Sequence, residues 1–106
     1  MTAREVVRTR LGVEPERIDR FCRKWRIREL SLFGSSLRDD FRADSDVDLL
    51  VVFESDAGWD LFDVVHMEDE LREIFGRDVD LVEKSAITNP FRRYEILTTR
   101  RVLYAA

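Results

Sequence analysis

The sequence predicts an α+β fold, a small mixed sheet with helices packed mainly on one face and an acidic cleft on the other. Three segments alternate apolar and polar residues as strands do: 27–33, 46–53 and 77–82. Two others repeat apolar residues at the spacing of amphipathic helices: 15–25 and 60–76. With 106 residues the chain is expected to form a single domain, residues 1–106, too short for a catalytic core plus a substrate domain.

The composition, 44% hydrophobic and 38% charged residues, is that of a soluble globular protein. No apolar run approaches the roughly 20 residues that span a bilayer, and the first residues lack the apolar centre of a secretion signal, so no membrane association is expected. The net charge of -4 argues against broad capture of nucleic acid, so no direct nucleic-acid substrate is expected. The only cysteine, Cys22, cannot form an internal disulfide, which favours a reduced, cytoplasmic location.

The N-terminal part of the chain reads as helical. The segment up to Val13 is expected to be a loosely placed helix without chemistry. Pro15 suits the first position of a second helix over 15–25. The apolar positions of that helix recur at i, i+3, i+4 and i+7, and they are Ile18, Phe21, Cys22 and Trp25. This stripe predicts a helix that packs on the sheet.

The strand over 27–33 leads into the first candidate ligand site. It runs into Gly34, where the missing Cβ lets backbone approach a ligand closely. Ser35 or Ser36 is expected to cap a short helix, and a helix start with a hydroxyl and backbone N–H groups suits phosphate oxygens. The sequence therefore predicts a phosphate cradle at Gly34, Ser35 and Ser36, followed by a polar loop over 38–45.

The next strand begins with two aspartates on one face. In a strand over 46–53, Asp46 and Asp48 point the same way, and the other face carries an apolar stripe. Like charges held that close repel and raise each other's proton affinity, so the arrangement favours a cation between them. The pair predicts a divalent-metal site that faces the phosphate cradle.

A long helix is predicted between Asp60, a suitable N-cap, and Gly76, which ends it. Its expected apolar stripe consists of Leu61, Val64, Val65, Leu71, Ile74 and Phe75. His66, the only histidine, falls within this helix and is left out of the site. Trp59 precedes it and is expected to be a packing anchor rather than a base-stacking residue.

The third strand, over 77–82, carries Asp78 and Asp80. Asp80 lies among apolar neighbours and needs compensation for its charge, which a metal held by Asp46 and Asp48 would supply if the strands are adjacent. Asp78 is the weaker candidate because it lies nearer the strand mouth. Asp80 is thus a candidate third carboxylate of the site.

The C-terminal part is predicted to hold a last helix with Phe91, Tyr94 and Leu97 and an edge strand over 102–104. Its basic residues outnumber its single acid, Glu95, and they are Lys84, Arg92, Arg93, Arg100 and Arg101. A solvated helical face explains most such clusters. A role in holding a triphosphate or an acidic partner surface is the alternative.

The spacing of Gly34-Ser35 and Asp46-Val47-Asp48 resembles the signature of DNA polymerase β-like nucleotidyltransferases, and the chain is most similar to their minimal, single-domain members, the MntA-type antitoxins that partner HEPN-domain (HepT) toxins. The resemblance runs from Phe21 to Tyr104. One departure is the loop after the Gly-Ser turn, which often has a glycine in the family and here reads Arg38-Asp39-Asp40.

The resemblance implies a nucleotidyltransferase fold and an enzyme that moves AMP from ATP to a hydroxyl, expected to be a tyrosine, of a cognate HEPN ribonuclease. Asp46, Asp48 and Asp80 would hold Mg²⁺, expected as two ions, and Gly34, Ser35 and Ser36 would hold the leaving phosphates. The partner toxin is expected to form a hetero-oligomer with this chain. Two alternatives remain: a nucleotidyltransferase acting on an aminoglycoside-like small molecule, and a non-catalytic antitoxin that blocks its partner by contact.

Overall fold

The computed structural model describes all residues except 39, 40 and 43. In chain order its elements are α1 Ala3–Thr9, α2 Pro15–Lys24, β1 Ile27–Phe33, the 3-10 turn η1 Gly34–Leu37, β2 Val47–Phe53, α3 Leu61–Phe75, β3 Val79–Glu83, the 3-10 turn η2 Lys84–Ala86, α4 Pro90–Thr99 and β4 Arg101–Ala105. Asp39 and Asp40, where the chain departs from the family's loop, lie outside the described residues. Within the described part, no helix is long and apolar enough to cross a bilayer.

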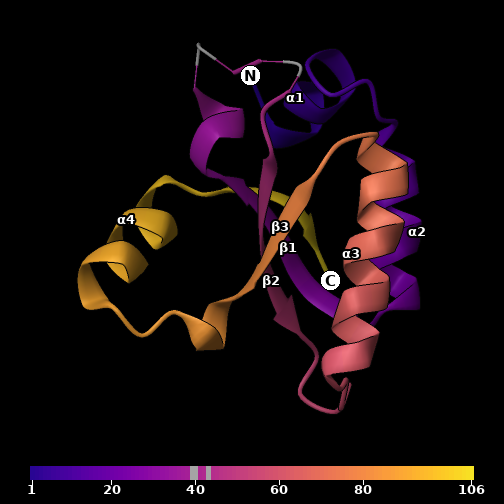
Figure 1. Cartoon of the computed structure of the whole chain (residues 1–106), viewed down its shortest axis with the longest axis vertical. Coiled ribbons are helices and arrows are strands. Elements are labelled where there is room, and N and C mark those ends of the chain that lie inside the picture. The colour runs from indigo at the N-terminus through magenta and orange to yellow at the C-terminus, as the bar shows by residue number, and fades with distance from the viewer. Residues whose placement is uncertain (39–40, 43) are drawn as a thin grey trace.

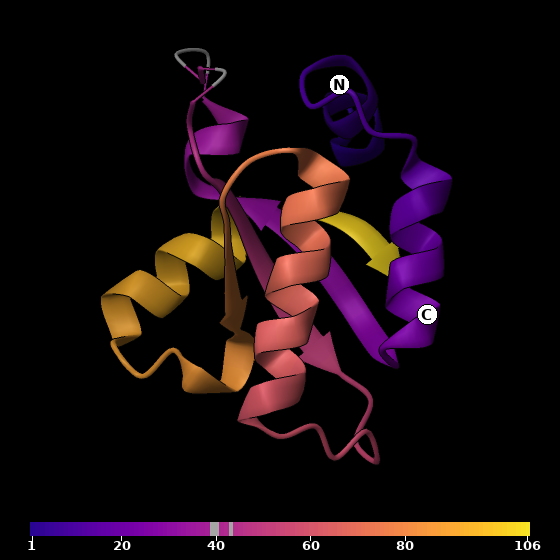
Figure 2. The same ribbon diagram turned by 45° about the vertical axis from the view of Figure 1, so that its right-hand side comes forward.

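The sheet is mixed, as the sequence predicts, with strand order β3-β2-β1-β4. β1 pairs antiparallel with both β2 and β4, whereas β2 and β3 are parallel and are joined by a crossover through α3. Helices α2 and α3 cover one face, and α4 lies on the other side of the sheet (Figure 1 and Figure 2). The predicted adjacency of the second and third strands is therefore confirmed, and β4 is the predicted edge strand.

The main core lies between the sheet and helices α1 to α3. Each strand sends every second side chain into it, which is why Leu30 and Leu32 of β1 pack beside Leu49 and Val51 of β2. All four are nearly inaccessible to solvent. The alternation seen in the sequence thus assigns the inner face correctly.

Helix α1 is anchored rather than loosely placed. Val6 and Val7 are buried in the main core, and Arg4 donates two hydrogen bonds to the carboxylate of Asp19 on α2, at 2.7 and 2.9 Å. This two-bond arrangement matches the planar guanidinium to the carboxylate and lowers the pKa of Asp19. The expectation of a loose helix was wrong because the partner of Arg4 is distant in sequence.

Helix α3 has the predicted ends but a different buried stripe. Asp60 and Asp63 form a reciprocal capping box, and Gly76 ends the helix with φ 66°. The buried residues are Met67, Leu71, Ile74 and Phe75. Leu61 and Val65, predicted to be in the stripe, are 76% and 47% exposed. Val65 is turned by about 160° from Met67 around the helix axis, so both cannot face the sheet.

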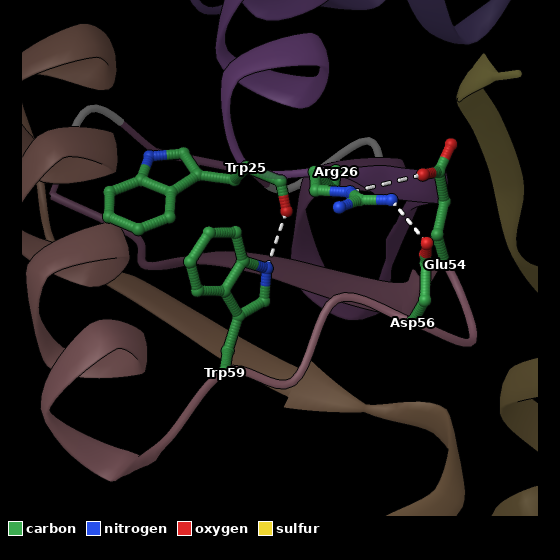
Figure 3. Close-up of polar contacts among 5 residues, drawn as sticks. All are labelled: Trp25, Arg26, Glu54, Asp56 and Trp59. Atoms are coloured by element: carbon green, nitrogen blue, oxygen red, sulfur yellow. Dashed lines mark hydrogen bonds and ion pairs between the residues drawn. The ribbon is translucent and has the colours of Figure 1, made fainter.

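The loop between β2 and α3 is held against the junction of α2 and β1 by the contacts in Figure 3. Trp59 packs edge-on against Trp25, with ring centroids 5.1 Å apart, and its Nε1 donates to the Trp25 carbonyl at 2.6 Å. Arg26, in the left-handed region with φ 53°, pairs with Asp56 at 2.6 Å and with Glu54 at 3.5 Å. The geometry agrees with Trp59 as a packing anchor.

A smaller core lies under α4 on the other face of the sheet. It consists of Phe33, Leu50, Ile87 and Ile96. Ile96 is the buried residue of α4, whereas Phe91 and Tyr94 are 85% and 72% exposed. This second core sets α4 over the face of the sheet that carries the aspartates.

Candidate functional site

The candidate site lies where β1 ends and β2 begins. In the antiparallel register Phe33 pairs with Asp48, so the Gly34 turn follows directly beside Asp48. In the parallel register Asp48 pairs with Asp80 of β3. Asp46 lies just before β2, two residues from Asp48 and therefore on the same side. The fold thus places the three predicted carboxylates along the neighbouring strands β2 and β3, with Asp48 and Asp80 paired directly.

Gly34 allows the close approach of the turn to Asp48. Its φ of 69° is in the left-handed region, and a Cβ built on it would collide with Oδ2 of Asp48. The backbone N–H of Ser35 donates a hydrogen bond to the Asp48 carboxylate. The missing Cβ of Gly34 was expected to allow close approach of a ligand. In the structure it allows close approach of the Asp48 carboxylate.

The two serines of the turn are engaged differently. The Ser35 hydroxyl donates to the Asp46 carbonyl at 3.2 Å from a partly exposed position. The Ser36 hydroxyl is fully buried and donates to the Phe33 carbonyl at 3.2 Å. The expectation that a serine caps this helix was wrong, because the N-cap is Phe33 and no side chain caps it. The Ser36 hydroxyl thus braces the turn, while Ser35 faces the opening.

The environment of Asp48 disfavours its charged form. Burial is the main cause that raises the pKa of this half-buried carboxyl, and the charges of Asp80 and Asp46 add to it. The Ser35 N–H and the Arg92 guanidinium act in the opposite direction. A cation bound near Asp48 would therefore relieve the repulsion that Asp80 and Asp46 exert on it.

The carboxylates suit a divalent cation in donor chemistry and charge, since Mg²⁺ binds oxygen ligands. Asp46 and Asp80 are exposed, and their side chains make no hydrogen bond or ion pair within the described residues, so nothing holds them away from an ion. As they stand, no three His, Cys, Asp or Glu side chains of the described chain are grouped closely enough to hold one. Asp78 forms an ion pair with Arg72 instead, whose Nε lies 3.8 Å from the Asp78 carboxylate.

A cavity of about 480 Å³ opens beside Gly34, between the turn and α4. Arg38, Arg92 and Arg101 line it, together with the single acid Glu95. A second cavity, of about 500 Å³, lies near Trp59 at the far end of β2 and contains none of the predicted site residues. Of these two cavities, the first therefore borders the candidate site, through Gly34 alone, because none of the three aspartates and neither serine lines it.

Sequence reasoning did not place Arg38 at the site. It put Arg92 in the C-terminal basic cluster, for which binding of a triphosphate or of an acidic partner surface was the alternative to a solvated face. The other reactive side chains lie elsewhere. His66 is exposed on α3, and Cys22 is buried in the main core, where burial raises the pKa of its thiol to about 12. Neither contributes to this arrangement.

Comparison with protein families matches residues 15–103 to the nucleotidyltransferase domain. The protein adenylyltransferase MntA of Thermococcus cleftensis is 41% identical over 61 residues, which cover 58% of this chain and 60% of the relative.

Two solved structures give the same picture of the fold. A structure assigned as a minimal nucleotidyltransferase is 31% identical, covers 94% of both chains and has a TM-score of 0.70. A complex from Shewanella oneidensis, of a tri-AMPylated HEPN toxin with an MNT antitoxin, matches with a TM-score of 0.62 and 19% identity, over 87% of this chain and 70% of the other. The predicted polymerase β-like architecture is confirmed.

Proposed function

The chain belongs to the nucleotidyltransferase domain family, and on that premise we propose that it transfers AMP from ATP to a tyrosine hydroxyl of a HEPN-domain toxin and acts as the antitoxin of that ribonuclease. The observation that carries the chemistry is the register of the sheet. It sets Asp48 beside Asp80 on one strand pair and beside the Gly34 turn on the other. Carboxylates for a metal and a backbone turn for phosphate then lie side by side.

Different residues would bind the metal and the nucleotide. Asp46, Asp48 and Asp80 would hold Mg²⁺, and we expect two ions. Bound Mg²⁺ would stabilise the attacking and leaving oxygens at the α-phosphorus. Ser35 would donate its hydroxyl to the phosphates that leave as pyrophosphate, after releasing the Asp46 carbonyl that it now contacts. Gly34 keeps the turn close to Asp48, and Ser36 holds the turn to β1 through Phe33.

Two observations support a protein as the acceptor. The related adenylyltransferase of Thermococcus cleftensis is named for action on proteins, and the similar Shewanella oneidensis antitoxin forms a complex with a toxin that carries AMP. This chain also exposes large apolar side chains that a partner would cover: Leu61 and Phe62 on α3, and Phe91 and Tyr94 on α4. A hetero-oligomer with the toxin is the expected assembly.

The test uses a matched pair of neutralising variants on one segment. The chain is incubated with its HEPN partner, ATP and Mg²⁺, and intact mass spectrometry should show one AMP residue, or a small multiple, added to the partner. Asp80→Asn should lower the rate by about 10² or more because it removes a charge from the metal site. Asp78→Asn, at an exposed carboxylate beside Arg72, should leave the rate within a few-fold.

The outcomes separate the alternatives. A partner that is inhibited at unchanged mass would refute AMP transfer and leave a non-catalytic antitoxin. Label found on an aminoglycoside-like alcohol, and not on the partner, would make the chain a small-molecule enzyme. Equal losses in the two aspartate variants would remove Asp80 from the site.

A further inference from the structure

The cavity beside Gly34 has a charge opposite to that of the carboxylates next to it. Its charged lining is Arg38, Arg92, Arg101 and Glu95, a net positive set. Asp48 lies against the same turn, since a Cβ on Gly34 would touch it. An acidic end and a basic end therefore meet at Gly34.

Two of these arginines have no partner for their guanidinium groups within the described residues. The side chains of Arg38 and Arg92 make no hydrogen bond or ion pair, whereas Arg101 donates to the Met1 carbonyl at 2.8 Å. Arg92 is nonetheless close enough to act on the charge of Asp48. Arginines that line a cavity and have no carboxylate partner suit an anion, and the planar guanidinium fork matches phosphate oxygens.

The ligand follows from the order of groups along the opening. A nucleotide whose α-phosphorus lay at Asp48 would have its next phosphates near the Gly34 turn, which touches Asp48 and lines the basic cavity. We propose that Arg92, from α4, and Arg38 form a polyphosphate subsite that binds the β- and γ-phosphates of the donor and, after transfer, the pyrophosphate. This inference rests on the proposed function for its ligand.

The subsite gives the basic C-terminal cluster a specific function. Arg92 enters the cavity from the first turn of α4, which is held over this face of the sheet by Ile96. Arg93, its neighbour, is used differently, because it donates to the Lys84 carbonyl at 2.9 Å and ties α4 to η2. The cluster therefore divides into a ligand-binding arginine and a structural one.

The test measures binding without acceptor or turnover. Isothermal titration of the full chain with inorganic tripolyphosphate, ATP and AMP, each with Mg²⁺, is compared for Arg92→Gln, Arg38→Gln and Arg28→Gln. Each cavity variant should weaken tripolyphosphate and ATP by about tenfold, the loss typical of one charged hydrogen bond, and leave AMP unchanged. Arg28 is exposed on β1, lines none of the described cavities and supplies the same change of charge, so its variant should bind like wild type.

A variant that removes a negative charge from the cavity provides a second test, with the opposite expected effect on binding. Glu95→Gln removes the single acid from the cavity lining and should tighten tripolyphosphate binding by a few-fold, more at low salt than at high salt. Unchanged tripolyphosphate affinity in the Arg92 variant, or an equal loss of AMP affinity, would overturn the subsite. A chain that binds tripolyphosphate through Arg92 but never modifies a partner would instead refute the proposed function and leave the subsite standing.

Discussion

Replacement of Gly34 by alanine tests how the turn and Asp48 depend on each other. Gly34 has φ 69°, and a Cβ there meets Oδ2 of Asp48, whose carboxylate already accepts a hydrogen bond from the Ser35 N–H. The added methyl group must therefore displace either the turn or the carboxylate. Gly12 provides the control, because its φ is 66° and nothing lies within 4 Å of its Cβ position.

The two variants share one cost and differ in a second. A left-handed alanine costs about 1–2 kcal/mol at either position. Gly34→Ala also disturbs the hydrogen bond between Ser35 and Asp48, which we take as about 1 kcal/mol more because Asp48 is only half-buried. The difference in Tm between the variants should then be about 4–8 °C.

The effect on function should be much larger than the effect on stability. A displacement of Asp48 by about 1 Å is enough to cost on the order of 10² in rate, whereas Gly12→Ala leaves the site untouched. Urea unfolding gives the two stabilities, and AMP transfer at a temperature where both variants are folded gives the rates. Equal rates for the two variants would refute the dependence of Asp48 on Gly34.

Two further predictions concern charge and packing. The raised pKa of Asp48 means that the folded chain binds this proton more tightly than the unfolded chain, so metal-free stability should fall as pH rises from about 4 through the folded-state pKa. At pH 7 without metal, Asp48→Asn should therefore raise Tm by a few degrees and should abolish the stabilisation by Mg²⁺ and ATP, both followed by thermal melts; an unchanged Mg²⁺ and ATP response would contradict the metal site. Trp59→Phe keeps an aromatic ring but removes the hydrogen bond to the Trp25 carbonyl, and should cost about 1 kcal/mol in urea unfolding; no change would mean that this hydrogen bond adds nothing to the other contacts of the loop.

Local sequence signals predicted the elements near the site well. The first strand has the predicted bounds, Ile27–Phe33, because its alternation is clear and Gly34 ends it. The ends of α3 followed from Asp60 and Gly76, whose capping roles depend on the local backbone only. Where a signal is local, the sequence was a sufficient guide.

The errors arose where a choice between similar residues depends on distant packing. Leu61, Val65 and Met67 are all apolar, and only the angle at which α3 lies on the sheet decides that Met67 is buried. The two serines after Gly34 are identical in sequence terms. Burial against β1 decides that Ser36 braces the turn while Ser35 stays accessible.

The residues of the site were also harder to predict the farther apart they lie along the chain. Gly34 directly follows β1, which pairs antiparallel with the strand that carries Asp48, so their spacing in sequence is a usable signal. The prediction of Asp80 needed the further assumption that successive parallel strands are neighbours in the sheet, which is common but not obligatory. The position of Arg92 depends on the path of η2 and α4 across the face of the sheet that carries the aspartates. No local pattern specifies that path. The sequence therefore indicates only a basic cluster, and the tertiary structure is needed to single out Arg92 as the member of α4 that acts on Asp48.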